Sequence, residues 1–425
     1  GALRSNTTAS NNTATGYNAL YANTTATDNT AIGKSALASN TTGNQNTASG
    51  QETLYSNTTG TRNSGHGQGA LYSNTTGSYA TAVGYRALYT SVTHTVNADN
   101  YNVAVGYRAG YGQTTGIRNV AIGAFSLDAA VTGNDNVGVG YGTLGVNTSG
   151  EQNVAVGTTA LELNTTGGNL VALGYNALSA NTTANNNIAV GYNALLRTTT
   201  GDENTAVGKD SMKDNTTGAG NSAFGVESLS NITTASNNTA IGKLSIYVNT
   251  TGGANVAVGN QALRLNSTGG NNTAVGHYAL KNNTVNYNTA VGHEALLSTT
   301  TGHSNTAIGQ EAGDNITTGD NNIIIGKGID AASATADNQL NIGGWVIGKT
   351  DGDLIGFGRG GTGFARMHVT LSGRALIPDA TWTTVAYLSH THSGICTVMV
   401  YDSDRGCIVG GMTTAYGGTD KDTIS

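Results

Sequence analysis

A phrase of the type Asn-Thr-Ala-Val-Gly returns at every seventeenth position along most of this 425-residue chain. Aligned on the glycine that closes the phrase, 20 repeats lie between Gly16 and Gly343, and all but two of the spacings between them are equal. The spacing from Gly84 to Gly106 is longer because it contains an insertion around Thr90 to Asn100, and the spacing before Gly292 is shorter by one position. A unit this short cannot hold a helical hairpin, and it is poor in helix formers. The repeat therefore predicts an all-β chain, a parallel β-roll or β-solenoid of about 20 coils.

Each position of the unit has its own residue type. Ala stands two residues before the repeat glycine in 16 units, an aliphatic residue usually stands one before it, and Leu stands four after it in 14 units. We expect two short strands per coil, the Thr-Ala-Val-Gly segment and a second segment that contains Ala-Leu. Because side chains alternate along a strand, the Val or Ile should point inward to meet the Leu, and the Ala should form an outer face with the glycine.

Asparagine occupies the position four residues before the glycine in 17 units. At a turn, its amide can satisfy backbone groups and bond from one coil to the next. We therefore expect a structural ladder of asparagines beside the column of repeat glycines. The predicted ladder residues include Asn119, Asn136, Asn153, Asn187, Asn204, Asn288, Gly123, Gly140, Gly157, Gly191, Gly208 and Gly292.

The apolar content of each coil is small: one branched aliphatic residue, one Leu and two small residues. Burial of a large side chain stabilises by ~1.5–3 kcal/mol, whereas ordering each residue costs ~1–2 kcal/mol of backbone entropy. A single column of such coils is therefore marginal. The stripe of small side chains predicts that the Ala face packs closely against other copies of the chain.

The phrases NTAIG, NVAVG and NTAVG resemble the head repeats of YadA-type trimeric autotransporter adhesins, which are left-handed parallel β-rolls wound three together. The longer form NTAVGYNALxxNTTG, followed by NNIIIGKGIDAASATADNQLNIGGWVIGK, is similar to bacteriophage tail fibres. The resemblance covers residues 1–349. The unit is longer than that of the adhesins, and no coiled-coil stalk or anchor barrel follows it, which favours a phage-type or secreted fibre.

The resemblance implies a homotrimeric, extracellular fibre on a virion or a cell surface. Its partners would be two sister chains, an upstream fibre or base component on the N-terminal side, and a glycan or protein receptor on a cell surface. The long coil with the insertion and the C-terminal end are the expected contact points, because binding residues are commonest in variable loops.

The period fades after Gly343, so we divide the chain into a shaft (1–345), a Gly-rich junction (346–363) and a head (364–425). ARMHVTL, WTTVAYLSHTH and ICTVMVYD read as strands, which predicts a small antiparallel β domain that is complete only with further residues or in the trimer. Gly356, Gly358 and Gly361 fit GxGxxG, but the expected strand and helix around a dinucleotide site are missing.

The head contains several candidate ligands. His390 and His392 would share one face if their segment is a strand, and in a trimer three such pairs could hold an axial transition metal, as the resemblance to phage fibre tips implies. Two polar histidines at a strand end are the preferred alternative, and no other cofactor is expected. Asp402 and Asp404 fit a solvated turn better than a calcium site. Cys396 and Cys407 could pair or remain free thiols.

Other functions fit the composition less well. The net charge is −6 and Lys and Arg are scattered, so nucleic acid is not an expected partner. No apolar run reaches the ~20 residues that cross a bilayer. Sparse acidic residues disfavour a polysaccharide-cleaving tailspike enzyme, and adjacent threonines disfavour an ice-binding face. Tyrosines after the repeat glycine (Tyr17, Tyr85, Tyr107, Tyr141, Tyr175 and Tyr192) fit a variable solvent-facing position better than a glycan stripe. We predict a structural and adhesive fibre, not an enzyme.

Overall fold

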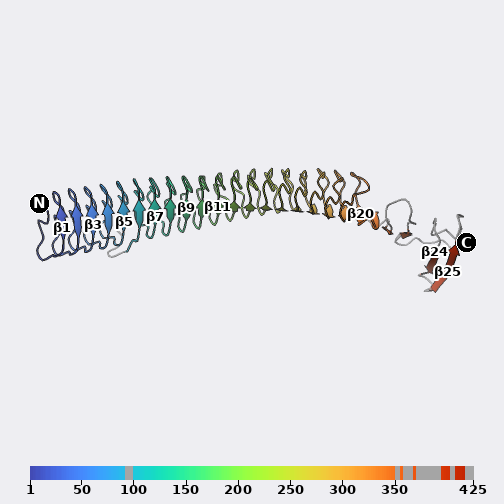
Figure 1. Ribbon diagram of the computed structural model, residues 1–425, viewed down its shortest axis with the longest axis horizontal. Helices are drawn as coiled ribbons and strands as arrows, with labels where there is room; N and C mark the ends of the chain where they lie inside the picture. Colours follow the sequence, from blue (N-terminus) through green and yellow to red (C-terminus); the bar gives the residue numbers. More distant parts are fainter. Residues whose placement is uncertain (91–98, 350–354, 358–366, 370–393, 403–406, 417–425) are drawn as a thin grey trace. The chain divides into compact units, whose positions relative to one another are not determined.

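The computed structural model describes residues 1–90, 99–349, 355–357, 367–369, 394–402 and 407–416. The described chain is all-β and forms about 19 turns of a parallel β-solenoid with a repeat of ~17 residues (Figure 1). The predicted fold class and repeat length are confirmed at this level. Within the long coil, residues 91–98 lie outside the described part. The chain divides into two compact units, Gly1–Tyr287 and Asn288–Ser425.

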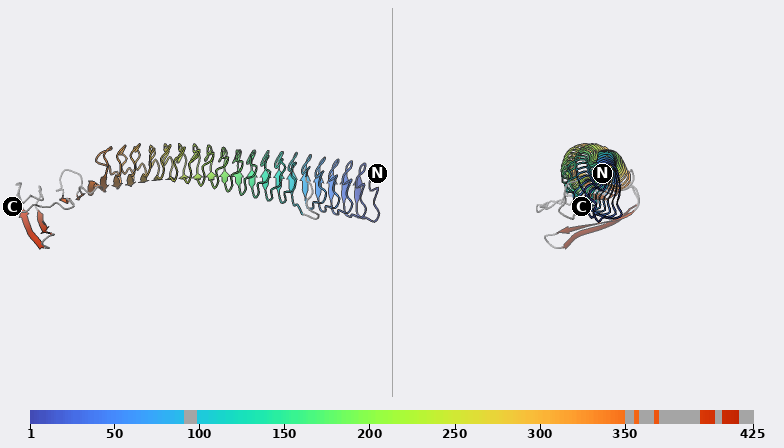
Figure 2. Two further views of the ribbon diagram at one scale, coloured as in Figure 1. Left: turned by 180° about the vertical axis from the view of Figure 1, so that it is seen from behind. Right: turned by 90° about the vertical axis from the view of Figure 1, so that its left-hand side faces the viewer.

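In the first unit each coil contributes one strand of three residues, and each strand pairs in parallel with the next (Figure 2). The register places equivalent residues side by side, for example Ala155 beside Ala172. The prediction of two strands per coil is wrong, because the Ala-Leu segment forms turns. The strands are β1 (Thr13–Thr15), β2 (Thr30–Ile32), β3 (Thr47–Ser49), β4 (Ser64–His66), β5 (Thr81–Val83), β6 (Val103–Val105), β7 (Val120–Ile122), β8 (Val137–Val139), β9 (Val154–Val156), β10 (Val171–Leu173), β11 (Ile188–Val190), β12 (Thr205–Val207), β13 (Ser222–Phe224), β14 (Thr239–Ile241), β15 (Val256–Val258) and β16 (Thr273–Val275).

The second unit begins with further parallel strands and then changes to antiparallel pairing. Strands β17 to β20 pair in parallel, whereas β20 to β23 pair antiparallel in chain order, and β24 pairs antiparallel with β25. Strands therefore occur inside the range 346–363, which the sequence assigned to a Gly-rich junction. The strands are β17 (Thr289–Val291), β18 (Thr306–Ile308), β19 (Ile323–Ile325), β20 (Gln339–Ile342), β21 (Val346–Lys349), β22 (Ile355–Phe357), β23 (Met367–Val369), β24 (Gly394–Asp402) and β25 (Cys407–Tyr416).

The interior of each coil is filled by Ala and Leu, which reverses the predicted orientation of the strand. In β9, the side chain of Ala155 is fully buried, whereas Val156 is 39% exposed. Leu161, in the turn that follows, is also fully buried. The middle residue of the strand therefore points inward, and the two residues that flank it point outward. The prediction of an outer Ala face is wrong.

Most coils carry Ala at the middle of the strand, and the larger Ile324 of β19 is buried there beside Gly313, where an added Cβ would lie 3.3 Å from its Cγ1. Gly138 replaces the usual Ala in β8, and a Cβ added there would lie 2.6 Å from Oγ of Ser126 and 3.0 Å from Oγ1 of Thr143. Both of these residues stand where most coils carry another Ala. The larger side chains of Ser126 and Thr143 thus fill the space that the missing methyl group of Gly138 leaves, as expected of a close-packed interior.

Three positions in nearly every coil adopt left-handed backbone conformations that non-glycine residues rarely occupy. In one coil these are Thr159, Leu161 and Asn169, with φ of 55°, 52° and 58°. They make the sharp corners that return the chain to its start within a single repeat. The corner at Leu161 also directs the Leu side chain into the coil, so one strained residue supplies the largest apolar group of the interior.

Candidate functional site

The asparagines four residues before the repeat glycine form a ladder inside the coils. Asn153 shows the pattern: its backbone N–H donates to Oδ1 of Asn136 at 3.1 Å, and its Nδ2 donates to the carbonyl of Gly167 at 2.9 Å. Its Oδ1 accepts the N–H of Leu170 at 3.0 Å. These side chains satisfy buried backbone groups and cannot reach a ligand. The predicted members Asn119, Asn136, Asn153, Asn187, Asn204 and, in the second unit, Asn288 are all fully buried.

A second asparagine ladder, seven residues after the repeat glycine, lies beside the first. Asn164 donates from Nδ2 to Oδ1 of Asn147 and to the carbonyl of Gly167, both at 2.9 Å. Asn181 continues the ladder by donating to Oδ1 of Asn164 at 2.8 Å. The period of the Asn-Thr-Thr phrase was the available signal for this ladder. Its function is the same internal satisfaction of polar groups.

The hydroxyl group of the first Thr in that phrase also bonds between coils. Oγ1 of Thr165 donates to the carbonyl of Thr182 at 2.9 Å, and Thr182 repeats the bond to Thr199 at 3.1 Å. The second Thr, for example Thr166, is exposed. The Thr pair therefore lies in a turn, not on a strand, so only one of its two members faces solvent.

The repeat glycines are required by backbone geometry. At Gly157, φ is +130°, and a Cβ added there would lie 2.4 Å from the carbonyl oxygen of Gly174 in the next coil. Side chains are excluded both by the conformation and by the neighbouring backbone. The predicted glycines share this conformation, with φ from +122° to +145°: Gly123, Gly140, Gly157, Gly191, Gly208 and, in the second unit, Gly292.

Several residues singled out in the C-terminal sequence lie outside the described part of the chain. The histidine pair of the predicted axial metal site is among them, as is part of the GxGxxG match. The residues concerned are His390, His392, Asp404, Gly358 and Gly361. Gly356 lies within β22, and Asp402 ends β24.

The register of β24 and β25 separates the two cysteines. Cys396 lies opposite Thr414, and Cys407 lies opposite Asp402. Six residues of strand therefore separate their positions along the ladder, roughly 20 Å at ~3.4 Å per residue. A disulfide requires Cα atoms within about 7 Å. The predicted alternative of a Cys396–Cys407 bond within one chain is therefore wrong.

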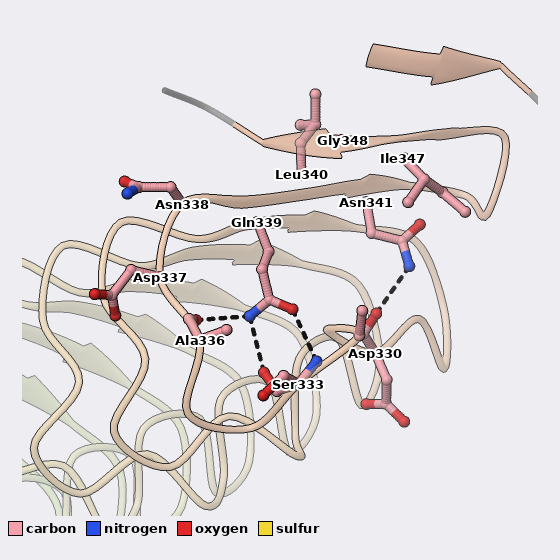
Figure 3. Close-up of a pocket in the computed structure, with 11 residues that line it drawn as sticks. Asp330, Ser333, Ala336, Asp337, Asn338, Gln339, Leu340, Asn341, Ile347 and Gly348 are labelled. Atoms are coloured by element: carbon pink, nitrogen blue, oxygen red, sulfur yellow. Dashed lines mark hydrogen bonds between the residues drawn. The ribbon is translucent and has the colours of Figure 1, made fainter. Parts of the chain in front are cut away.

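A cavity of 610 Å³ lies beside the last loop of the solenoid in the second unit (Figure 3). Gln339 occupies the ladder position of the asparagines and holds this loop. Its Nε2 donates to the carbonyls of Ser333 and Ala336 at 2.8 and 2.7 Å, and its Oε1 accepts the N–H of Ser333 at 2.8 Å. Asn341 donates to the carbonyl of Asp330 at 2.8 Å. The side-chain amides of Gln339 and Asn341 are thus bonded to the chain's own backbone, which indicates that these two residues close the loop.

Carboxylates gather in the turns of the second unit. One ligand atom each from His293, Glu294 and Glu311 lies within 4.8 Å of the others, a spacing that a metal ion could bridge. Nearby, partial burial and then the hydrogen bond to the carboxyl of Asp330 raise the pKa of Asp314 to about 6. Charges on Glu311 and Glu294 contribute to the same shift. Burial first, and then the neighbouring carboxylates, thus favour the protonated form of Asp314.

Tyrosines form a row at the position five residues after the repeat glycine in the first unit. Tyr55, Tyr72, Tyr89 and Tyr111 stack in successive coils, with ring centroids 5.1, 4.9 and 5.3 Å apart. Burial, and then the neighbouring phenols of Tyr89 and Tyr55, raise the pKa of Tyr72. The regular spacing of these tyrosines, each five residues after a repeat glycine, is visible in the sequence.

Two arginines lie against this row, and each also lies against a second aromatic ring, Tyr85 for Arg86 and Phe125 for Arg108. Cζ of Arg86 is 5.1 Å from the ring centroid of Tyr85 and 5.0 Å from that of Tyr89. Cζ of Arg108 is 4.2 Å from the ring of Tyr111. We call this region the aromatic–arginine surface; its members are Tyr55, Tyr72, Tyr85, Arg86, Tyr89, Tyr107, Arg108, Tyr111 and Phe125.

The tyrosines directly after the repeat glycine face solvent. Two neighbouring pairs stack on each other, Tyr85 with Tyr107 and Tyr175 with Tyr192, each with centroids 5.4 Å apart. Stacking leaves their edges and hydroxyl groups outermost. The exposed fractions range from 37% to 68% for Tyr17, Tyr85, Tyr107, Tyr141, Tyr175 and Tyr192.

The outward side chains of six successive strands, β6 to β11, form an apolar strip. Both outward positions of each strand are aliphatic here, whereas β1 to β4 carry Thr, Ser and His at most of them. Val105, Val156 and Leu173 are 37%, 39% and 36% exposed. We call this strip the aliphatic sheet face; its members are Val103, Val105, Val120, Ile122, Val137, Val139, Val154, Val156, Val171, Leu173, Ile188 and Val190.

Comparisons of the chain with protein-family models, with curated proteins and with solved structures found no match. Within the described residues, no helix has the length and apolar character needed to cross a membrane.

Proposed function

We propose that the chain is a structural and adhesive fibre: an extracellular homotrimeric shaft that carries a C-terminal head to a receptor on a cell surface. Sister chains, an upstream fibre or base component, and a surface glycan or protein are its partners. The tail fibres and trimeric adhesins that the repeats resemble provide the precedent for this assembly.

The aliphatic sheet face is the observation that carries this proposal. Soluble monomers rarely expose contiguous apolar patches larger than a few hundred Å², and larger ones usually mark an interface. Val156 and its neighbours are held on a regular sheet at one coil per ~4.8 Å, so the strip extends across six coils. Covering this face stabilises the association by about 25 cal/mol for each Å² of apolar surface removed from water.

A second copy of the chain is the occupant that fits this face best. An identical solenoid has the same rise per coil, so ridges of Val and Ile on one copy match the grooves of another over many coils. The interior Ala side chains take no part, because they are buried within each coil. Three copies, as in the fibres that the sequence resembles, enclose the strip around a common axis.

The interior supports a scaffold role over catalysis. Side-chain amides such as those of Asn153 and Asn164 already donate hydrogen bonds to a neighbouring backbone carbonyl. Such a solenoid holds surface groups at fixed spacing, which is what an extended shaft requires.

Native mass spectrometry of the full chain tests the proposal. A particle of three times 42.9 kDa is expected at micromolar concentration, and a single-chain mass contradicts the trimer. The adhesive part is tested separately by binding of the labelled particle to bacterial and animal cell surfaces, with heat-unfolded protein as the control. Retention equal to that of the unfolded control contradicts adhesion.

A further inference from the structure

Arg86 presents a cationic group that is held in place by aromatic rings. Its guanidinium lies against the rings of Tyr85 and Tyr89. A guanidinium that stacks on an aromatic ring keeps its N–H donors in its own plane, where a carboxylate can accept two of them. Within the described residues no carboxylate forms an ion pair with Arg86. By contrast, Arg108, Arg118 and Arg197 are each paired with an aspartate.

The part of the shaft around Arg86 is less acidic than the chain as a whole. Residues 1–135, which include the ion-pair partners of Arg108 and Arg118, contain six basic and five acidic residues, so their formal charge is +1, against −6 for all 425 residues. Repulsion of an anionic ligand by the net charge is therefore weak here, and the attraction comes from Arg86 itself. The residues counted are Arg4, Lys34, Arg62, Arg86, Arg108 and Arg118 against Asp28, Glu52, Asp99, Asp128 and Asp135.

The tyrosine row beside Arg86 offers hydroxyl groups at regular intervals. Because the rings of Tyr55, Tyr72, Tyr89 and Tyr111 cover one another's faces, the outer edge of the row is left for contact. A phenol hydroxyl both donates and accepts hydrogen bonds. Closely spaced groups of this kind match a ligand that carries several hydroxyls on each unit, which is the chemistry of a sugar. A peptide strand would instead need an open sheet edge.

We propose that the aromatic–arginine surface binds a carboxylate-bearing glycan. A sugar carboxylate accepts two N–H bonds from Arg86, and hydroxyls of neighbouring sugars bond to the phenols of the tyrosine row. Arg108 contributes less, because its Nη2 already donates to Asp128 at 3.2 Å. This inference rests on the proposed adhesive function and adds to it the class of ligand and a location in the shaft.

Titration of the full-length protein with short oligogalacturonides, followed by calorimetry, tests the inference. Arg86→Gln should weaken binding by about tenfold to a hundredfold, the range for a lost charge-assisted hydrogen bond. Arg86→Lys keeps the charge but loses the planar fork, so its affinity should lie in between. Arg197→Gln, which removes an arginine paired with Asp214, is the matched control and should bind as the parent does. Neutral malto-oligosaccharides should not bind.

Three results would overturn the inference: no binding of oligogalacturonide to the parent protein, equal affinity for the parent and Arg86→Gln, or equal affinity for poly-glutamate, which would identify a general acidic-polymer surface. Native masses of the same samples separate this test from that of the fibre. If the protein is a trimer but does not bind oligogalacturonide, only the glycan site is contradicted. If the protein is a monomer, the trimeric shaft is contradicted, whether or not the monomer binds oligogalacturonide.

Discussion

Asn153 and Asn164 donate to the same carbonyl oxygen, that of Gly167, at 2.9 Å each. The first belongs to one internal ladder and the second to the other, so each carbonyl of this type joins two columns of amides. Buried backbone acceptors have two lone pairs and are costly to leave unpaired. A repeated network of buried hydrogen bonds therefore takes the place of much of the apolar core that a larger domain would have.

Asn153→Ala should open one coil without unfolding its distant neighbours. The substitution leaves Gly167 with one of its two donors, but it leaves the buried N–H of Leu170 without an acceptor, at a cost of ~1–3 kcal/mol. Because solenoid coils interact mainly with adjacent coils, the loss should be local. Hydrogen exchange is the measurement: the Leu170 amide should exchange faster, and the amides of β2 and β3 should not. Asn260→Ala, outside the ladders, is the control.

Thr198→Asn should stabilise the chain. Thr198 interrupts the second ladder, so Oδ1 of buried Asn181 has no hydrogen-bond donor among the described residues. Asn215, on the other side, reaches Oγ1 of Thr198 at 3.3 Å. An asparagine here would donate to Asn181 and accept from Asn215, a gain of ~1 kcal/mol. Urea unfolding should show a higher midpoint, whereas Thr200→Asn in the exposed turn should leave it unchanged. A lower midpoint for Thr198→Asn would contradict the ladder account.

Gly157→Ala should destabilise far more than Gly167→Ala. Gly157 combines φ of +130° with a carbonyl 2.4 Å from any added Cβ. A Cβ at Gly167 would also be close, 2.3 Å from the carbonyl of Ala184, but Ala184 occupies the equivalent position one coil later, so the backbone there accommodates a methyl group. We expect a loss of ~1–3 kcal/mol or more at Gly157. Thermal unfolding of the two variants compares them directly, and equal melting temperatures would disprove the difference.

The solenoid could be predicted because its period is a property of the sequence itself. A constant spacing aligns like residues in neighbouring coils whatever the orientation of the side chains. The orientation could not be derived in the same way. In a strand as short as β9, side chains alternate equally well whether Val154 or Ala155 points inward. Only the width of the closed coil decides between these two orientations.

The turns explain why that width was not foreseen. Leu161 adopts a left-handed conformation that is rare for Leu, so its position in a turn is hidden from propensity arguments. Once it turns inward, little space remains for more than the methyl group of Ala155. The aromatic–arginine surface has a weaker signal: the row that contains Tyr55 and Tyr72 is confined to a few coils, whereas the interior positions repeat along the whole solenoid.

Val156→Asp should weaken association between chains. A carboxylate on the aliphatic sheet face would lose its hydration when another copy covers it, which costs several kcal/mol unless it is paired. Val146→Asp is a matched control, because Val146 is 41% exposed against 39% for Val156 but lies in a turn. Sedimentation equilibrium should show a smaller average mass for Val156→Asp than for Val146→Asp. Unchanged mass for both would exclude this face as the interface.

The stability of the second unit should fall as pH rises through the titration of Asp314. Folding raises the pKa of this carboxyl from 3.8 to about 6. The folded state therefore binds more protons than the unfolded state between these values, and stability decreases with pH across the interval. Below pH 3.8, Asp314 is protonated in both the folded and the unfolded state, so it no longer destabilises the fold.

Asp314→Asn should flatten the dependence of the melting temperature on pH. Asp135, whose pKa is lowered by its hydrogen bond to Arg118, should show the opposite trend, since its contribution is lost as pH falls. If Asp314→Asn keeps the parent's slope, the carboxylates around Asp314 do not set it.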